Sequence, residues 1–221
     1  MNFDWQFAWQ ILPSLAAGAR ITLGVTLASF CVALVGGALL LATIQLSPRW
    51  IGRPLRQMAD FVRGTPLLVQ VFFFFYMLPD WGVILGPLQT GVVVFGLHYS
   101  CYLYEAYRSA LLSVRSTQWS AGKALGLSGE QVFRFIVLPQ MGPVFVPIAG
   151  SFLVYMFKDT PVLAAITVRE MMQVASQIGA DNFRYMEPLT IVGVLFLAMS
   201  LAVSRGVRWL ERRITLWRQR A

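Results

Sequence analysis

Residues 21–46 read ITLGVTLASFCVALVGGALLLATIQL, a stretch without a single charged side chain. A helix needs about 20 apolar residues to cross roughly 30 Å of hydrocarbon, so this stretch predicts a membrane-spanning helix. Within it, Ser29, Ala33 and Gly37 recur every four residues and form a face of small side chains. Such a face lets another helix approach closely, and we expect helix packing there rather than contact with lipid.

The composition of the 221-residue chain fits a membrane protein. Hydrophobic residues make up 57% and charged residues 13%, against roughly a quarter charged in an average soluble domain. This balance excludes a disordered chain, a coiled coil, a disulfide-rich secreted domain and most soluble enzymes. Further apolar stretches predict spans at about 57–78, 90–112, 141–157 and 188–206. We therefore expect an all-α polytopic membrane protein with five transmembrane helices.

Shorter segments flank and connect these spans. Residues 1–18 mix tryptophans with polar residues around Pro13, which predicts a separate interfacial segment. Residues 113–135 form the longest polar connection, and residues 210–221 form a basic tail. The transmembrane domain is thus expected to cover residues 19–209.

The positive charges indicate an orientation. The chain carries 18 Lys and Arg against 10 Asp and Glu, and with five spans fourteen of the basic residues fall on one side. Because that side is normally cytoplasmic, we expect the N-terminus outside and the C-terminus inside. No basic stripe with interleaved polar recognition residues is present, which argues against nucleic-acid binding.

The 113–135 connection has its own local signals. Residues up to Leu125 are expected to form a short helix closed by Gly126 in a left-handed conformation. Ser128 and Gln131 fit the first and last positions of a capping box, so a second helix is expected to begin there. Pro139 marks the entry to the next span. Two short helices at the membrane surface could act as a lever, although an ordinary surface loop fits the same residues.

The spacing in this connection resembles the EAA loop of the integral-membrane subunits of bacterial ABC importers. That loop reads Glu-Ala-Ala, three residues, Gly, nine residues, then Ile-x-Leu-Pro. In this chain the matching positions are Ser120, Ala121, Gly122, Gly126, Ile136, Leu138 and Pro139. Ser120 replaces the family's glutamate, so a contact that needs that carboxylate is not implied here.

The resemblance extends over nearly the whole chain. Residues 63–70, RGTPLLVQ, are similar to the segment that enters the second span in polar amino-acid permeases of the histidine/glutamine/arginine group. Glu105, Arg108 and the sequence Lys158-Asp159-Thr160 fit the same group. The Pro79-Asp80 turn and residues 183–188, FRYMEP, look most like ectoine/hydroxyectoine permease subunits.

The resemblance implies the type I ABC importer fold and a multi-pass place in the bacterial inner membrane. It implies pairing with a second permease subunit, identical or not, two ATPase subunits in the cytoplasm and a solute-binding protein outside. The chain contains no G-x-x-x-x-G-K-[ST] phosphate loop, so we expect ATP and Mg²⁺ to be used by the partner ATPase. We expect no catalytic residue, cofactor or metal site in the chain itself.

Polar residues inside the spans are candidates for the solute path. His98, Tyr102 and Glu105 share one face of the predicted 90–112 helix, and ionisable groups within a span usually face a cavity or one another. Glu105 could instead form an internal pair with Arg108 that only fixes packing. Lys158 and Asp159 could hold the two ends of a zwitterion, or form a boundary pair at the membrane surface.

Two other classes of function fit the sequence less well. An intramembrane enzyme is disfavoured because the sequence has no H-E-x-x-H and no G-x-S-x-G, and only one histidine. A half-unit of a secondary amino-acid transporter built from inverted repeats could have five spans, but the long polar connection would then have no role.

Overall fold

The structure is a computed structural model that describes residues 3–220, and their side chains as far as Arg213. Throughout the described residues, regular structure consists of helices. In chain order these are α1 (Trp5–Leu46), α2 (Arg49–Gly64), α3 (Leu67–Phe72), α4 (Pro87–Leu112), α5 (Ser116–Ala124), α6 (Gly129–Val132), α7 (Leu138–Asp159), α8 (Met171–Asn182) and α9 (Met186–Arg220). Short turns of π-helix (Phe73–Met77, Phe133–Val137) and 3-10 helix (Leu78–Trp81, Thr160–Ile166) join them.

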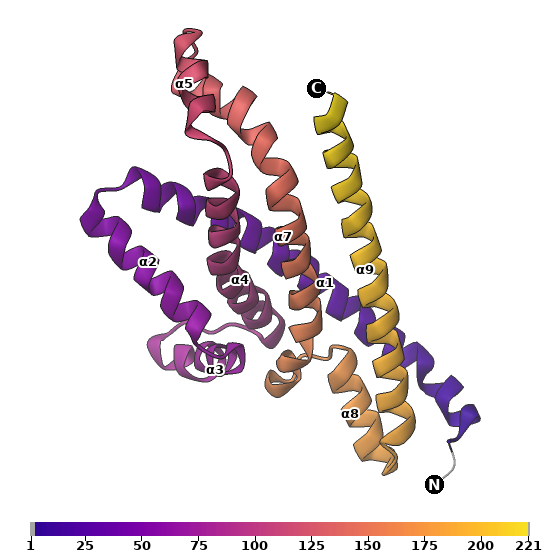
Figure 1. Ribbon diagram of the computed structural model, residues 1–221. Coiled ribbons are helices and arrows are strands. Elements are labelled where there is room, and N and C mark those ends of the chain that lie inside the picture. Colours follow the sequence, from indigo (N-terminus) through magenta and orange to yellow (C-terminus); the bar gives the residue numbers. More distant parts are fainter. Residues whose placement is uncertain (1–2, 221) are drawn as a thin grey trace.

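The long helices form a bundle with two distinct ends (Figure 1). The short helix α5 and the carboxyl end of α9 lie at one end of the bundle. The helices α3 and α8 and the amino end of α1 lie at the other end. The polar connection and the carboxyl end of α9 thus lie together, opposite the amino end of α1.

Membrane-spanning length is met by three helical stretches among the described residues: α1, the run Gly129–Ile166 that contains α7, and α9 as far as Arg213. The α2–α3 pair adds a fourth span if the two bent helices are taken together. The remaining expected span corresponds to α4, which is long enough to cross a membrane but is more polar than the other spans. Half of its 26 residues are buried among other helices. Among its polar residues, Thr90, His98 and Ser100 are buried, while Glu105 and Arg108 remain partly exposed.

The expected span at 57–78 is not one straight helix, because it is broken between α2 and α3. Helix α2 begins at Arg49 and ends at Gly64, and α3 begins at Leu67 after a bend of 104°. The cause is Pro66, whose ring disfavours a helical conformation at the preceding residue. Thr65 is accordingly extended, with φ −95° and ψ 141°.

The expected boundaries at the two ends of the chain are also different. Helix α1 runs without a break through Pro13, so residues 5–18 continue into the first span instead of forming a separate segment. Asp4 caps this helix, because its side chain accepts hydrogen bonds from the backbone N–H of Gln6 and Phe7. Leu15 is fully buried against α8 and α9. At the other end, α9 continues to Arg220 and includes the described part of the expected basic tail.

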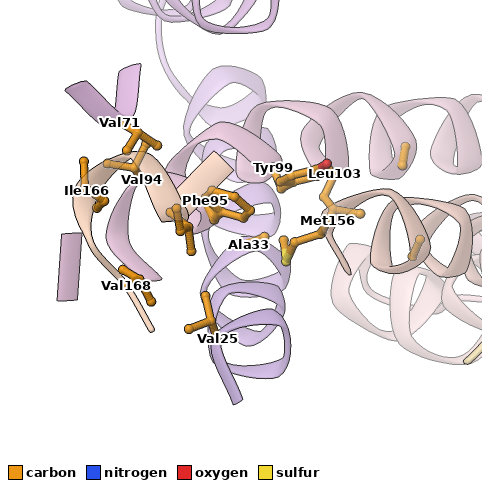
Figure 2. Packing of buried hydrophobic residues seen from close by; sticks show 13 residues of the cluster. Val25, Ala33, Val71, Val94, Phe95, Tyr99, Leu103, Met156, Ile166 and Val168 are labelled. Atoms are coloured by element: carbon orange, nitrogen blue, oxygen red, sulfur yellow. The ribbon is translucent and has the colours of Figure 1, made fainter. Parts of the chain in front are cut away.

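The core lies where α1 crosses α4. Val25 and Ala33 of α1 meet Val94, Phe95 and other side chains of α4 there (Figure 2). The small-residue face behaves as predicted, because Ser29, Ala33 and Gly37 are all buried. A β-carbon on Gly37 would lie only 2.9 Å from both Leu103 Cβ and the Tyr104 backbone nitrogen. The backbones of α1 and α4 thus lie too close together at Gly37 to admit a larger side chain.

An ion-pair cluster ties the start of α1 to the start of α9. The Arg184 guanidinium donates to Asp4 at 3.1 Å and to Glu187 at 2.7 Å. The backbone N–H of Phe7 and the Arg184 side chain lower the pKa of Asp4 below its ordinary value of 3.8. Because the folded pKa is the lower one, the ionised carboxylate stabilises the fold above the unfolded pKa, and this contribution is lost as the pH falls through the folded pKa.

We expect Arg184→Gln to lower the melting temperature of the purified protein slightly at neutral pH. The difference from wild type should shrink as the pH falls through the lowered pKa of Asp4, below which this carboxyl group is protonated in both proteins. Arg169→Gln is the matched control, because Arg169 is exposed and makes no ion pair among the described residues. An undiminished difference at low pH would show that Arg184 acts through packing instead.

Candidate functional site

The polar connection between α4 and α7 folds as its sequence predicts. Helix α5 ends at Ala124, and Gly126 follows with φ 77°, the left-handed conformation that glycine adopts most easily. The Gly126 N–H donates to the Lys123 carbonyl at 2.9 Å. Ser128 and Gln131 form the expected capping box, with distances of 2.8 and 3.3 Å. The chain therefore turns sharply between two short helices.

One side of this connection is fixed to the bundle and the other side is free. Gly122 and Val132 are buried together with Val137, beneath the half-buried Trp119 and Ile136. On the outer side, the other matching positions Ser120, Ala121, Gly126, Leu138 and Pro139 are exposed, and Leu125 at the tip is 78% exposed. Helix α6 leads through a π-helical turn into α7, so the connection joins that helix without an intervening loop.

A second group of polar residues lies inside the bundle, where α2 breaks before α3. Gln70 of α3 donates through its amide to the Val62 carbonyl at 2.8 Å and to the Thr65 hydroxyl at 2.7 Å. Its amide oxygen lies 3.1 Å from Nδ1 of His98, which is buried. The break in the helix is thus held to the middle of α4 by one side chain.

Aromatic hydroxyls extend this group toward α7 and α2. The Tyr99 hydroxyl donates to the Asp159 carboxylate at 2.6 Å, and the Tyr102 hydroxyl donates to the Arg63 carbonyl at 3.1 Å. The rings of His98, Tyr102 and Phe152 pack together, with centroids 5.2 and 5.3 Å apart. Of the candidate path residues, His98, Tyr102 and Asp159 therefore belong to one cluster.

The other two candidates lie apart from it. Glu105 accepts a hydrogen bond from Arg108 at 2.7 Å, which is the internal pair that sequence analysis gave as the alternative to solute contact. Lys158 is exposed and makes no ion pair among the described residues, while its neighbour Asp159 bonds to Tyr99. The geometry gives no support to Lys158 and Asp159 as a pair.

Comparison with known proteins places this arrangement in a family. The family model described as binding-protein-dependent transport system inner membrane component matches residues 33–216. The chain belongs to this family. This inner-membrane component is 37% identical over 207 residues to a probable amino-acid ABC transporter permease protein of Sinorhizobium fredii, an alignment that covers 94% of this chain and 90% of the relative. It is 32% identical over 219 residues to the glutamine transport system permease protein GlnP of Escherichia coli, covering 98% and 100%.

Solved structures of related transporters share the fold of this inner-membrane component. The crystal structure of an amino acid ABC transporter with histidines matches with a TM-score of 0.90 at 24% identity, over 96% of this chain and 100% of that one. A chain of the MetNI methionine ABC transporter in an inward-facing conformation matches with a TM-score of 0.79 at 18% identity, over 93% and 98%. These matches establish the type I importer architecture expected from sequence.

Two residues of the cluster, Gln70 and Tyr99, are not among the solute-path candidates predicted from the sequence. Gln70 lies in the RGTPLLVQ segment, and an amide in an apolar stretch was the available signal. Tyr99 lies next to His98 and its ring packs against that of Tyr102, with centroids 5.9 Å apart, but it falls outside the 98, 102 and 105 spacing by which the other candidates were selected. Its partner Asp159 lies 60 residues away, and only the fold brings the two together.

The structure also explains why Gly122 stands where the EAA motif has its second alanine. A β-carbon there would lie 2.8 Å from Val132 Cγ2 and 2.9 Å from Ile136 Cδ1. We expect Gly122→Ala to destabilise the protein by roughly 1–3 kcal/mol through overpacking. Combining it with Val132→Ala should cost less than the sum of the two single changes, as thermal unfolding in detergent would show. Strictly additive losses would contradict this packing.

Proposed function

We propose that the chain is the permease subunit of an ATP-driven ABC importer that carries a polar amino acid or a related zwitterion into a bacterial cell. The observation that carries this proposal is the exposed segment formed by α5 and the turn at Gly126, residues 116–126, which we call the α5 arm. It occurs in a chain that belongs to the binding-protein-dependent transport family. Relatives named for glutamine and L-cystine transport support the solute class. Ectoine or hydroxyectoine is the narrower hypothesis, and it rests on the Pro79-Asp80 and 183–188 resemblance alone.

In this proposal the chain spans the inner membrane five times, with its N-terminus outside. The five spans are α1, the α2–α3 pair, α4, α7 and α9. The charge bias supports this orientation, as does the placement of α5 beside the carboxyl end and opposite the amino end (Figure 1). The transmembrane domain, from the start of α1 through α9, then presents the 113–135 connection to the cytoplasm.

The partners divide the work of import. Two ATPase subunits bind ATP and Mg²⁺ and move the α5 arm through the exposed Ser120, Ala121 and Gly126, while the buried Gly122 packs the arm against Val132. Since Ser120 lacks the family's carboxylate, docking of this arm relies on shape and apolar contact, which the exposed Leu125 offers. A second permease subunit completes the path, and a solute-binding protein delivers solute from outside.

The solute path follows the cluster around His98. Gln70, Tyr99 and Tyr102 present amide and hydroxyl groups, and Asp159 presents a carboxylate that could attract the ammonium group of a zwitterion. This cluster lies at the break between α2 and α3. In this proposal the two helices change their angle at the break and so open and close the path. Glu105 and Lys158 lie outside the cluster and are assigned no solute contact.

Reconstitution in liposomes tests the proposal. The assembled transporter should take up solute only with ATP on the ATPase side, and uptake should survive a protonophore. Uptake that a protonophore abolishes, without need for ATP, would favour the alternative of a secondary amino-acid transporter. Competition by glutamine, cystine, ectoine and hydroxyectoine then identifies the solute.

A further inference from the structure

Two hollows adjoin at the end of α1 that faces α5. One is an apolar groove of about 600 Å³ between α1, α4, α5 and α7, with Leu41, Trp119 and Phe145 in its wall. The other is a smaller hollow of about 290 Å³ between α1 and α2, lined by Arg49, Arg53 and Arg56. Gln45 lines both, so the two form one continuous surface that is apolar on one side and basic on the other.

The basic hollow is built to hold an anion. Its three arginines stand at spacings of four and three residues, and therefore on one face of α2. No acidic residue lines the hollow, and none of the three arginines forms an ion pair within the described part of the chain. The three exposed arginines therefore place like charges on one face with no acidic side chain among them, a surface that complements an anion.

The apolar groove is built to hold hydrocarbon. Its volume falls within the range of about 300–1,000 Å³ that ligand sites commonly have. Its polar groups are few, and the Tyr107 hydroxyl already donates to the Leu34 carbonyl. On α2 next to the arginines, Trp50 is 75% exposed, as is common for tryptophan at a membrane surface.

We propose that this double hollow binds one anionic phospholipid of the cytoplasmic leaflet, with its phosphate among Arg49, Arg53 and Arg56 and an acyl chain in the groove. The orientation on which this rests is that of the proposed function. A phospholipid fits because its anionic and apolar parts are joined at the membrane surface, as the two hollows are. Since Trp119 of α5 forms part of the groove, the bound lipid supports the α5 arm directly.

Fluorescence of Trp119 measures occupancy of the groove. The full chain, isolated with the subunits that accompany it, is placed in phosphatidylcholine bilayers that contain a small fraction of lipid brominated on its acyl chain. The Trp119 share of quenching is the difference between wild type and Trp119→Phe. We expect brominated phosphatidylglycerol to associate on the order of tenfold more strongly than brominated phosphatidylcholine.

Charge-matched variants separate this site from general attraction to the membrane. The triple variant Arg49→Gln, Arg53→Gln, Arg56→Gln should lose the preference. The control Arg205→Gln, Arg208→Gln, Arg212→Gln removes three exposed charges of α9 at the same end of the bundle and should keep it.

Three results would overturn the proposal. Equal quenching by both brominated lipids would mean that the groove ignores the headgroup. Absence of quenching by either would mean that a second permease subunit or another protein segment covers the groove. Suppression by millimolar inorganic phosphate would mean a simple anion site. The measurement needs no ATP, solute or binding protein, so its failure is distinct from failure of the proposed function.

Discussion

Replacing Gly126 with valine is expected to lower solute-stimulated ATP hydrolysis and solute uptake together, by roughly tenfold. Gly126 has φ 77°, and a residue with a β-carbon adopts this conformation at a cost on the order of 1–2 kcal/mol. Valine is worse than most residues because its side chain branches at that carbon. If this free energy is lost from the docked conformation of the arm, its population falls roughly tenfold, and coupled activity falls with it.

The surroundings of Gly126 make the experiment specific. No atom lies within 4 Å of a β-carbon placed there, so the substitution disturbs the turn and the docking surface without damaging the bundle. Insertion into the membrane and the affinity of the external solute-binding protein should be unchanged. Gly126→Asn should retain more activity, since asparagine tolerates the left-handed conformation.

Gly129 provides the matched control in the same connection. It also has open space around it, but its φ is not positive, so Gly129→Val lacks the conformational penalty. ATP hydrolysis and uptake are measured in the same liposomes for all three variants. Normal stimulation in Gly126→Val would show that this turn does not transmit the motion of the ATPase.

Replacing Gly37 with leucine is expected to prevent assembly of the bundle. A β-carbon at this position would come within 2.9 Å of the Tyr104 backbone nitrogen and 3.0 Å of the Ser100 carbonyl oxygen. Because backbone atoms cannot rotate away as a side-chain tip can, α1 and α4 must separate. The cost of such overpacking is about 3 kcal/mol or more.

Gly24→Leu, on the same helix, is the control for this prediction. A β-carbon at Gly24 meets nothing within 4 Å, so leucine there adds the same volume without the collision. Yield of monodisperse protein in mild detergent and its melting temperature are the measurements. A Gly37→Leu protein with the yield and stability of the Gly24→Leu protein would contradict the observed α1–α4 contact.

The parts of the fold that follow from local sequence could be predicted. The positive φ of Gly126 and the capping box of Ser128 depend only on residues a few positions apart, and both are confirmed. The small-residue face of α1 was also predicted, because periodicity shows which side chains share a face. What periodicity could not show is the partner, which proved to be α4.

The errors have a common physical cause. The span at 57–78 was predicted as one helix because the stretch is hydrophobic on average. The effect of Pro66 on the preceding residue was not taken into account, and the helix breaks at Thr65. Pro13 was given too much weight in the opposite direction, since packing of the residues around it keeps α1 continuous. Proline thus acts according to tertiary context, which a single sequence does not reveal.

The site was predicted unevenly for the same reason. His98 and Tyr102 lie on one face of one helix and could be found together. Gln70 and Asp159 come from other helices, and the sequence offered no way to place them beside α4. Family motifs located the α5 arm in full, because its residues are contiguous.

In the proposed transporter the α5 arm docks on the ATPase, and site-directed cross-linking detects this contact. A cysteine carrying a photoactivatable cross-linker is placed at Leu125, which is 78% exposed, or at Phe183, which is 91% exposed at the opposite end of the bundle. In the assembled transporter, position 125 should cross-link to the ATPase subunit, and position 183 should not. Failure of position 125 to reach the ATPase, or cross-linking of position 183 to it, would contradict the account.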